Sequence, residues 1–466
     1  MTAARHRTET GTAATARPLR RVLVANRGEI AARIIRTCRR LGIEAVLAVS
    51  DTDADSLPAR LADATVRLGP PPSSASYLDV SAVVSAAVAC GAQAVHPGYG
   101  FLSENQRLAR ACGDAGIVFV GATPAQLAAV GDKLRARGHA EAAGIPVVPG
   151  GESTESADAA ELAERIGFPL LVKAVGGGGG RGMKRVTDPA ELRSTVELAM
   201  SEAQAAFGDP RVYLERFIAS GRHVEVQLLG DGERVVHLGT RDCSVQRRYQ
   251  KLIEEAPAPM LDEQLREEMH RAAVRFGQRL GYRGLGTVEF LVDTRRRSFH
   301  FLEMNARIQV EHPVTEAVTG IDLVAEQLAV AEGHPLRLTQ AEVAPRGHAI
   351  ECRINAEDWT NDFLPHPGTV SHAEWPAGEG IRVDTHVQAG SQVPPFYDSL
   401  LAKLIVHAPT RAAAVRRLRD ALARCRVEGV RTTTGLHEAV VADRAFVAGG
   451  VDTAWFGRFL AGMGHG

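Results

Sequence analysis

The strongest constraint on the fold is an alternation of short apolar segments with helical segments that begins at Arg21. A strand predicted over Val22–Asn26 precedes a helix over Ile30–Leu41, and a second strand follows over Ala45–Ser50. Two more apolar strands, AQAVHP and GIVFVG, continue the pattern. Because strands that alternate with helices form a parallel sheet covered by helices, the sequence predicts a doubly wound domain over residues 21–130.

The pattern changes beyond residue 130. A helix is predicted over Lys133–Ala143 and a strand over Pro169–Val175. Later segments alternate apolar and polar residues between short turns, which is typical of an α+β arrangement. A third region contains strands at AIECRINA and KLIVHA and a helix over Ala412–Arg424. We therefore expect a disordered tail at residues 1–20 and three domains at residues 21–130, 131–344 (with a subdomain at about 148–220) and 345–466.

Composition argues against several classes of function. The chain has 54 Lys and Arg against 55 Asp and Glu, so its net charge of −1 creates no strong field for nucleic acid or an anionic membrane. No apolar run approaches the ~18 residues that span a bilayer. The six cysteines are scattered without a CxxC pair, which is typical of reduced thiols. We expect a cytoplasmic enzyme with no nucleic-acid or membrane partner.

The most prominent local motif is Gly176–Gly180, followed by Arg181 and Gly182. It satisfies GxGxxG and the start of GxxxxGK[ST], yet both phosphate-binding motifs need a helix directly after the loop. Here Met183–Val186 predicts a strand, and a helix begins only after Thr187. The loop therefore joins two strands, and we expect its backbone amides to cover a phosphate, because glycine lets a backbone approach polyphosphate closely. The alternative is a flexible surface linker.

A second motif is a predicted hairpin with a carboxylate on each strand. The segments GTVEFLV and FHFLEMN flank a basic turn, and Glu289 and Glu303 each lie seven residues from Arg296. If the hairpin is centred on Arg296, the two carboxylates lie opposite each other, where like charges repel. A Mg²⁺ ion between them would relieve the repulsion, since Mg²⁺ binds one or two protein carboxylates together with water and nucleotide phosphate. The alternative is a solvated strand face.

The residues after the hairpin continue this pattern. From Glu303 to Glu311 the odd positions are Glu, Asn, Arg, Gln and Glu, and the even positions are apolar. If the segment is extended, one face is apolar and the other carries these polar groups. Arg307 and Gln309 suit a small planar oxyanion, because a guanidinium binds two oxygens at once. Glu311 beside them is placed to accept a proton.

Together these motifs resemble those of the biotin carboxylases, the first-step components of biotin-dependent carboxylases. The resemblance runs from Arg21 to about Phe456. The segments that carry it, in the family's order, are ANRGEIAARI, HPGYGFLSEN, KAVGGGGGRGM, RDCSVQRRYQK, EEAPAP, EMNARIQVEHPVTE, ECRINAED and PPFYDSLLAKL. It implies a central ATP-grasp domain with a mobile glycine-rich subdomain, placed between the N-terminal parallel-sheet domain and a C-terminal biotin carboxylase domain.

The resemblance also implies roles for the matching residues. Its nucleotide-binding positions are Lys133, Lys173, Gly179, Gly180, Glu215, Arg216, Phe217, Ile218, His223, Gln246 and Tyr249. Its metal-binding positions, for two Mg²⁺ that Mn²⁺ can replace, are Glu289, Glu303 and Asn305. Its bicarbonate-binding positions are Lys251, Arg307, Gln309, Val310 and Arg353, with Arg353 also at biotin and Glu311 as the base. The implied catalytic set is Lys251, Arg307, Glu311 and Arg353.

One residue departs from the family pattern. Tyr249, in QRRYQK, stands where the family often has histidine. The position lies near the nucleotide in the family, so the ribose contact and the affinity for ATP stay open here, whereas the chemistry does not depend on it.

The implied activity is ATP-dependent carboxylation of biotin by bicarbonate, through carboxyphosphate, giving ADP and phosphate. The sequence has no Ala-Met-Lys-Met carrier segment. The implied partners are therefore a separate biotin carrier, a second copy of the chain and a separate carboxyltransferase subunit. We favour acetyl-/acyl-CoA carboxylase, and with it fatty acid biosynthesis, while the final acceptor stays open among acetyl-CoA, propionyl-CoA, pyruvate and urea.

Three alternatives differ in class. Another ATP-grasp ligase, joining a carboxylate to an amine, would share the fold and metals but not QRRYQK or RIQVEHP. A dinucleotide-dependent oxidoreductase would fit the N-terminal alternation, but VLVANRGE lacks the glycine fingerprint after its first strand. A catalytically silent nucleotide-binding regulator would not need the full set of charged residues.

Overall fold

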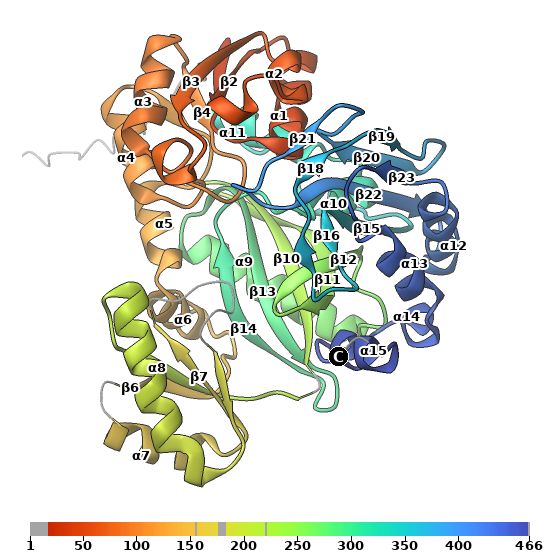
Figure 1. The fold of residues 1–466 in the computed structure, drawn as a ribbon. Helices are drawn as coiled ribbons and strands as arrows, with labels where there is room; N and C mark the ends of the chain where they lie inside the picture. Colours follow the sequence, from red (N-terminus) through yellow and green to blue (C-terminus); the bar gives the residue numbers. More distant parts are fainter. Residues whose placement is uncertain (1–16, 154–155, 176–182, 220, 465–466) are drawn as a thin grey trace, which may run out of the picture.

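The computed structural model describes residues 17–153, 156–175, 183–219 and 221–464. Figure 1 shows an N-terminal unit above a long central sheet, a smaller unit at the lower left and a C-terminal set of helices on the right. Residues 1–16 of the expected tail lie outside the described part of the chain. The backbone amide of Arg17 donates to the carbonyl of Glu332, and Leu19 is buried, so the chain is packed from Arg17 onward, ahead of the predicted start at Arg21.

The N-terminal unit contains the predicted parallel sheet. Its five strands have the order β3-β2-β1-β4-β5, and every neighbouring pair is parallel. The first helix begins at Gly28, earlier than predicted, and Gly28 has a φ of +67°. The strands are β1 (Arg21–Val24), β2 (Glu44–Ser50), β3 (Ala64–Gly69), β4 (Ala94–His96) and β5 (Val118–Phe119), and the helices are α1 (Gly28–Arg40), α2 (Leu57–Leu61), α3 (Val80–Ala89), α4 (Gln106–Asp114) and α5 (Pro124–Gly131).

The smaller unit contains an antiparallel sheet with the order β6-β9-β7-β8. The strand predicted directly after the glycine run is present as β8, and Gly176–Gly182 between β7 and β8 lie outside the described residues. The elements are α6 (Lys133–Ala142), β6 (Gly150–Ser153), α7 (Ser156–Ile166), β7 (Leu170–Ala174), β8 (Lys184–Val186), α8 (Leu192–Phe207) and β9 (Val212–Arg216).

The large sheet has eight strands in the order β14-β13-β10-β11-β12-β15-β22-β20. Its last three strands come from the region expected as a separate C-terminal domain, so the division predicted at residue 345 crosses a continuous sheet. The strands are β10 (Gly221–Asp231), β11 (Val235–Arg247), β12 (Gln250–Ala256), β13 (Arg283–Asp293), β14 (Ser298–Asn305), β15 (His348–Asn355), β20 (Ile381–Thr385) and β22 (Leu400–Ala408).

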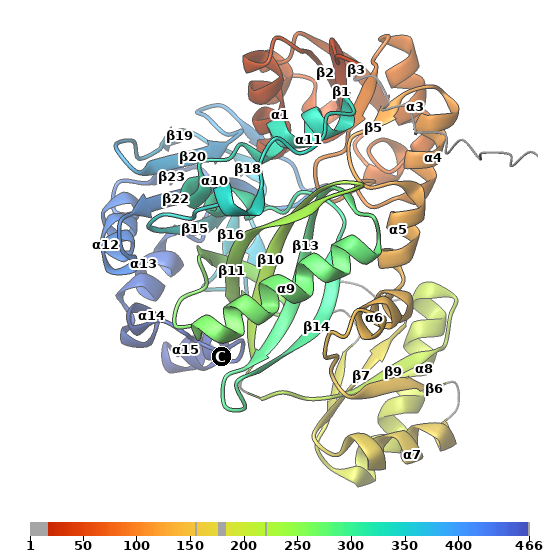
Figure 2. The same ribbon diagram turned by 180° about the vertical axis from the view of Figure 1, so that it is seen from behind.

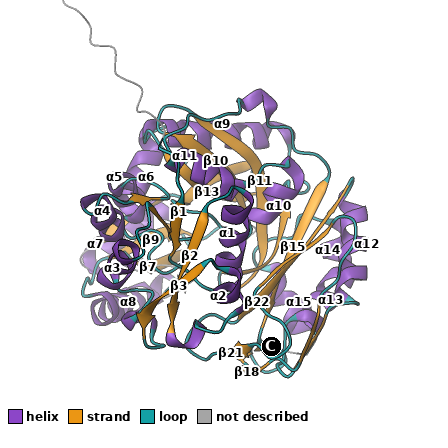
Figure 3. Ribbon diagram, turned by 90° about the horizontal axis from the view of Figure 1, so that it is seen from above, coloured by secondary structure: helices purple, strands orange, loops and turns teal. Residues whose placement is uncertain are grey.

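Helices cover this sheet and leave one region open for the site. The long helix α9 (Glu263–Arg279) crosses β10, β11 and β13, as Figure 2 shows, and buries Met269 and Phe276 against Phe290 and Phe301. On the C-terminal side, α12 (Arg411–Leu422) packs on β15 and β22, and Figure 3 shows it at the outer edge of the molecule. Burial of these apolar side chains stabilises the sheet by roughly 1.5–3 kcal/mol for each large side chain.

The remaining elements connect or extend these layers. The other helices are α10 (His312–Thr319), α11 (Leu323–Ala331), α13 (Thr434–Ala442), α14 (Arg444–Ala448) and α15 (Trp455–Gly462). Three two-stranded sheets pair β16 (Glu357–Asp358) with β17 (Leu364–Pro365), β18 (Gly368–Thr369) with β21 (Gln392–Val393), and β19 (His372–Glu374) with β23 (Arg426–Glu428). Short 3₁₀ turns lie at Asp51–Asp53, Ser73–Ala75, Pro189–Glu191 and Gln340–Glu342. Among the described helices, none combines the length and the apolar character needed to cross a bilayer.

Candidate active site

A cavity of about 1130 Å³ opens between the small sheet, the large sheet and the C-terminal strands. Strands β7, β9, β10, β11, β12, β13, β14 and β15 each contribute side chains to its wall. Every described residue among the predicted nucleotide, metal, bicarbonate and biotin positions lines this one cavity. Gly179 and Gly180 lie outside the described residues. The fold therefore gathers positions that are up to 220 residues apart in the sequence, from Lys133 to Arg353.

The two carboxylates of the hairpin lie directly opposite each other, as predicted, but the turn has a different centre and a β-bulge restores their pairing. The turn is centred between Arg295 and Arg296, since Asp293 pairs with Ser298. That register alone would place Glu289 opposite Leu302. A bulge between Phe290 and Glu289 shifts the register by one residue, so that Glu289 pairs with Glu303.

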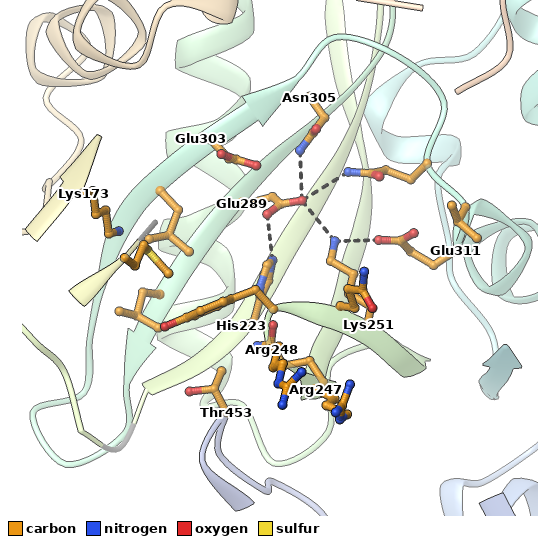
Figure 4. A pocket seen from close by; sticks show the side chains of 18 of the residues that line it. Lys173, His223, Arg247, Arg248, Lys251, Glu289, Glu303, Asn305, Glu311 and Thr453 are labelled. Atoms are coloured by element: carbon orange, nitrogen blue, oxygen red, sulfur yellow. Dashed lines mark hydrogen bonds and ion pairs between the residues drawn. The ribbon is translucent and has the colours of Figure 1, made fainter. Parts of the chain in front are cut away.

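Glu289 is the most heavily bonded carboxylate in the cavity (Figure 4). One of its oxygens accepts from the Lys251 ammonium at 3.0 Å, from the Asn305 amide at 2.9 Å and from the Gln309 amide at 3.2 Å. The other oxygen lies 2.9 Å from Nε2 of His223. Burial works to raise the pKa of Glu289, but Lys251 and His223 hold it far below the usual range.

Glu303 has the opposite environment. Its carboxylate makes no hydrogen bond or ion pair with another residue in the part of the chain that the structure describes, although Figure 4 shows it close to Glu289. Burial and the charge of Glu289 raise its pKa, and Lys133 only partly opposes them. An unpaired carboxylate beside an ionised one, with the side-chain oxygen of Asn305 near by, is a set of hard oxygen donors that fits Mg²⁺.

The segment after Asn305 is not extended, so the prediction of one straight polar face is wrong beyond that residue. Strand β14 ends at Asn305, and the Arg307 side chain lies between the side chains of Asn305 and Gln309. Arg307 donates to Oδ1 of Asn305 at 2.8 Å, to Oε1 of Gln309 at 2.8 Å and to Oε2 of Glu104 at 2.9 Å. The guanidinium is therefore fixed in the cavity wall.

A charged cluster lies next to this segment. Glu311, at the start of α10, accepts from Lys251 at 2.6 Å and from Arg353 at 3.0 Å. Burial would raise the pKa of the Glu311 carboxyl, but the two cations hold it well below its usual range. Lys251 also donates to Glu225 at 2.7 Å. Glu311 is therefore an ionised carboxylate held in the cavity wall, able to accept a proton once a substrate displaces one of these donors.

The other end of the cavity carries the predicted nucleotide positions. Lys173 on β7 forms an ion pair with Glu215 on β9, and Lys133 opens α6. Burial lowers the pKa of Lys133, whereas Glu303 acts to raise it. Tyr249 is half exposed in the turn between β11 and β12, where its φ is +66°. This end combines cations with the apolar side chains of the segment after β9, a mixture that suits a nucleotide.

Several residues of the site were not predicted. Glu225, Glu254 and Glu104 hold Lys251, Arg353 and Arg307 in place. Glu225 and Glu254 are fully buried on strands, so their neighbours in the sequence carry no sign of these long-range partners. Glu104 and Glu254 both lie inside segments of the family resemblance, HPGYGFLSEN and EEAPAP, which is the one signal that pointed to them.

Comparisons with known families match the chain in three consecutive parts. "Biotin carboxylase, N-terminal domain" matches residues 18–127, and "Carbamoyl-phosphate synthase L chain, ATP binding domain" matches residues 132–339. "Biotin carboxylase C-terminal domain" matches residues 351–458.

Two relatives illustrate the range of similar proteins. The chain is 50% identical over 439 residues to "Biotin carboxylase" of Nostoc sp., which covers 93% of this chain and 98% of the relative. It is 46% identical over 446 residues to a pyruvate carboxylase subunit of Methanothermobacter thermautotrophicus, which covers 95% of this chain and 90% of the relative.

Solved structures agree in fold. The chain matches a biotin carboxylase–β,γ-ATP complex from Campylobacter jejuni with a TM-score of 0.92 and 42% identity, over 95% of this chain and 99% of the other. It matches the biotin carboxylase domain dimer of the Hydrogenobacter thermophilus 2-oxoglutarate carboxylase, in complex with MgADP, ADP and bicarbonate. That match has a TM-score of 0.90 and 42% identity, over 94% of this chain and 97% of the other.

Proposed function

The chain belongs to the biotin carboxylase family and is an ATP-dependent ligase, and we propose that it carboxylates biotin on a separate carrier protein by way of carboxyphosphate. The observation that carries this proposal is the single cavity that contains every described residue of the predicted nucleotide, metal and bicarbonate positions. The reaction is the first half of a biotin-dependent carboxylation, and its other products are ADP and phosphate.

In the first step, bicarbonate occupies the space beside Arg307, Gln309 and the backbone of Val310. Glu311, whose pKa the neighbouring cations hold well below its usual range, removes the bicarbonate proton, and the oxyanion attacks the γ-phosphate of ATP. Lys133 and Lys173 lie at the nucleotide end, where their charges would hold the phosphates in line. Mg²⁺ held by Glu289, Glu303 and Asn305 would neutralise charge on the phosphate oxygens, and Mn²⁺ would serve in the same donor set.

In the second step, carboxyphosphate breaks down to CO₂ and phosphate, and the phosphate removes the ureido proton of biotin. Arg353 stabilises the enolate-like ureido oxygen that results. Its guanidinium points along the cavity wall between Glu254 and Glu311, with Nε 2.6 Å from Glu254 and Nη2 3.0 Å from Glu311. Lys251 keeps the carboxylates of Glu225, Glu289 and Glu311 together around this reaction space.

The partners and the final acceptor belong to this proposal as well. A separate biotin carrier and a separate carboxyltransferase would complete the reaction, and a homodimer is supported by the dimer named for the Hydrogenobacter relative. Relatives include subunits of pyruvate and 2-oxoglutarate carboxylases, so similarity alone does not select the acceptor. We keep acetyl-CoA or another acyl-CoA as the proposed acceptor. Co-purification with an acyl-CoA carboxyltransferase subunit supports it, and co-purification with a pyruvate- or 2-oxoglutarate-specific subunit contradicts it.

The direct test uses the purified full chain with ATP, magnesium, bicarbonate and free biotin. We expect ADP formation to require bicarbonate and to rise on addition of biotin, with labelled bicarbonate carbon recovered in carboxybiotin. ADP formation that needs an amine instead of bicarbonate would point to another ATP-grasp ligase. Lys251 and Arg307 disfavour that alternative, because they line the cavity and lie in QRRYQK and RIQVEHP, the segments that such a ligase would lack.

A further inference from the structure

Two buried carboxylates lie behind Arg353 and have no role in the reaction described so far. Glu254 on β12 and Glu351 on β15 are direct partners across the two antiparallel strands, and both are 0% exposed. Directly opposed residues have Cβ atoms about 4.5–5.5 Å apart, and like charges at this distance destabilise a sheet. Two ionised carboxylates here would be costly because no water reaches them.

Each of the two carboxyl groups has at least one oxygen without a hydrogen-bond partner among the described residues. One Glu254 oxygen accepts from Nε and Nη2 of Arg353 at 2.6 and 2.5 Å, but the other has no partner among the described residues. Both oxygens of Glu351 also lack a partner within the described chain. Lys403, the cation that acts on Glu351 from β22, instead bonds the Val310 carbonyl at 2.9 Å and the Glu29 carboxylate at 3.1 Å.

We propose that Glu254 and Glu351 share one proton and act as a positioning pair for Arg353. Glu351 carries the proton and donates a hydrogen bond to the free oxygen of Glu254. Glu254 stays ionised and orients the guanidinium toward bicarbonate and the biotin ureido oxygen. The shared proton satisfies two of the three oxygens that are otherwise unbonded among the described residues. It also leaves one negative charge, rather than two, behind Arg353. This role in the reaction rests on the proposed function, whereas the shared proton itself does not.

The charged surroundings of the pair support this arrangement. Glu351 faces Lys403 of β22, Glu254 of β12, Glu311 at the start of α10 and Arg353 of its own strand. Burial raises the pKa of Glu351 well above its usual value, and Lys403 does not offset this. Burial also raises the pKa of Glu254 to about 7, despite the opposing charge of Arg353.

The first test follows stability against pH in Glu351→Gln. A carboxyl group whose pKa is raised by folding keeps its proton in the folded state after the unfolded chain has lost it, so the folded state loses stability as pH rises above about 4.5. The amide that this substitution introduces does not titrate and can donate to the same Glu254 oxygen. We expect the variant to match the wild type near pH 5 and to have a Tm about 2–4 °C higher at pH 8.

Glu255→Gln is the matched control on the same strand as Glu254. Glu255 is also buried, but it is bonded to Arg411 at 2.7 and 2.9 Å and to His348 at 2.8 Å, and its pKa is lowered. Its loss should therefore lower Tm at pH 8 and matter less at acidic pH, the opposite trend. If Glu351→Gln shows a pH-independent change, or the trend of Glu255→Gln, then Glu351 is not protonated and the proposal is overturned. Should Glu351→Gln not fold, the apolar Glu351→Met of similar volume takes its place with the same expected trend.

The second test separates positioning from packing. Glu254→Gln keeps the shape of the side chain but removes the charge that orients Arg353. We expect kcat for bicarbonate-dependent ADP formation to fall tenfold or more, with the KM for ATP within twofold and partial recovery in Glu254→Asp. An unchanged kcat overturns the positioning role. A wild type without bicarbonate-dependent activity would instead contradict the proposed function, while the pH–stability test would still decide the shared proton.

Discussion

At the scale of single residues, the site depends on how each charge is matched. Glu289 and Glu303 are the same residue type on paired positions, yet the Glu289 carboxylate accepts three hydrogen bonds and pairs with His223, whereas the Glu303 carboxylate has no such partner within the described chain. The difference follows from which strands face them: His223 and Lys251 reach Glu289 from β10 and β12, whereas Glu303 lies on the edge strand β14. The pKa of Glu289 is lowered and that of Glu303 is raised for this reason.

Arg353→Ala tests the residue with the most specific proposed role. Removing it takes the ion-pair partner from Glu254, whereas Glu311 keeps Lys251, and the reaction loses the group proposed to stabilise the ureido oxygen. We expect carboxybiotin formation to fall by at least about 100-fold, since an oxyanion-stabilising donor accounts for about that factor. Nucleotide binding, measured by calorimetry, should persist. Arg353→Lys is the control that keeps the charge without the fork, and unchanged turnover in Arg353→Ala would remove this residue from the mechanism.

The sequence pointed to the residues proposed to contact substrates more clearly than to the residues that hold them in place. Glu303, Arg307 and Glu311 stand in one short motif with an unusual mixture of charges, and Glu289 stands on the preceding strand of the same predicted hairpin, so the pattern is visible without a structure. Glu225, Glu254 and Glu351 look like ordinary strand residues. Their partners are set by the pairing of distant strands, which no local spacing reveals.

At the scale of elements, the turn between β11 and β12 is a strained feature of the cavity wall. Arg248 and Tyr249 form a two-residue connection, and both have positive φ, +48° and +66°. Such a turn favours Asn-Gly, because glycine has no Cβ and asparagine tolerates positive φ better than most residues. An ion pair from Arg247 to Asp362 and the stacking of Arg247 over Phe363 at 4.2 Å hold the turn in place. Because QRRYQK contains neither asparagine nor glycine, it gave no sign of a tight turn.

Arg248→Asn should relieve part of this strain. Arg248 is exposed, and its contact with Asp362 at 3.3 Å is a surface ion pair that adds little to stability. Since asparagine tolerates positive φ better than arginine, we expect the free energy of unfolding to rise by about 0.5–1 kcal/mol. Denaturant unfolding measures the change. Arg247→Asn is the contrasting variant and should destabilise the protein, because it removes the contacts that hold the turn; the reverse order would contradict this account.

At the scale of the whole molecule, the eight-stranded sheet joins parts that the sequence pattern separates. Local periodicity predicted strands at β13, β14, β15 and β22, and the N-terminal parallel sheet was predicted except for its edge strand β3. The order β14-β13-β10-β11-β12-β15-β22-β20 was not predictable in this way, because neighbours such as β12 and β15 are about 90 residues apart and their pairing is a tertiary effect. The three family matches follow the sequence, whereas the sheet runs across the second and third.

A fragment of residues 132–339 tests this continuity. It would end before β15 and expose the edge of β12, where Leu252 and Ile253 are buried in the full chain. Open apolar edge strands promote aggregation, so we expect the fragment to be insoluble or to unfold at a much lower temperature. In the full chain, the large sheet should unfold in one calorimetric transition. A soluble fragment with the same Tm as that transition would show that the sheet does not act as one unit.

The single-residue bulge in the β13–β14 hairpin restricts how this segment can change in length. The turn register alone would pair Glu289 with Leu302. The bulge shifts the pairing by one residue and brings Glu289 opposite Glu303. Deleting one residue from the turn would rotate every side chain beyond it to the opposite side of the sheet and hide one carboxylate in the apolar core. In descendants of this gene, a residue lost from the turn should therefore be accompanied by the gain or loss of a bulge that keeps the two carboxylates opposite each other.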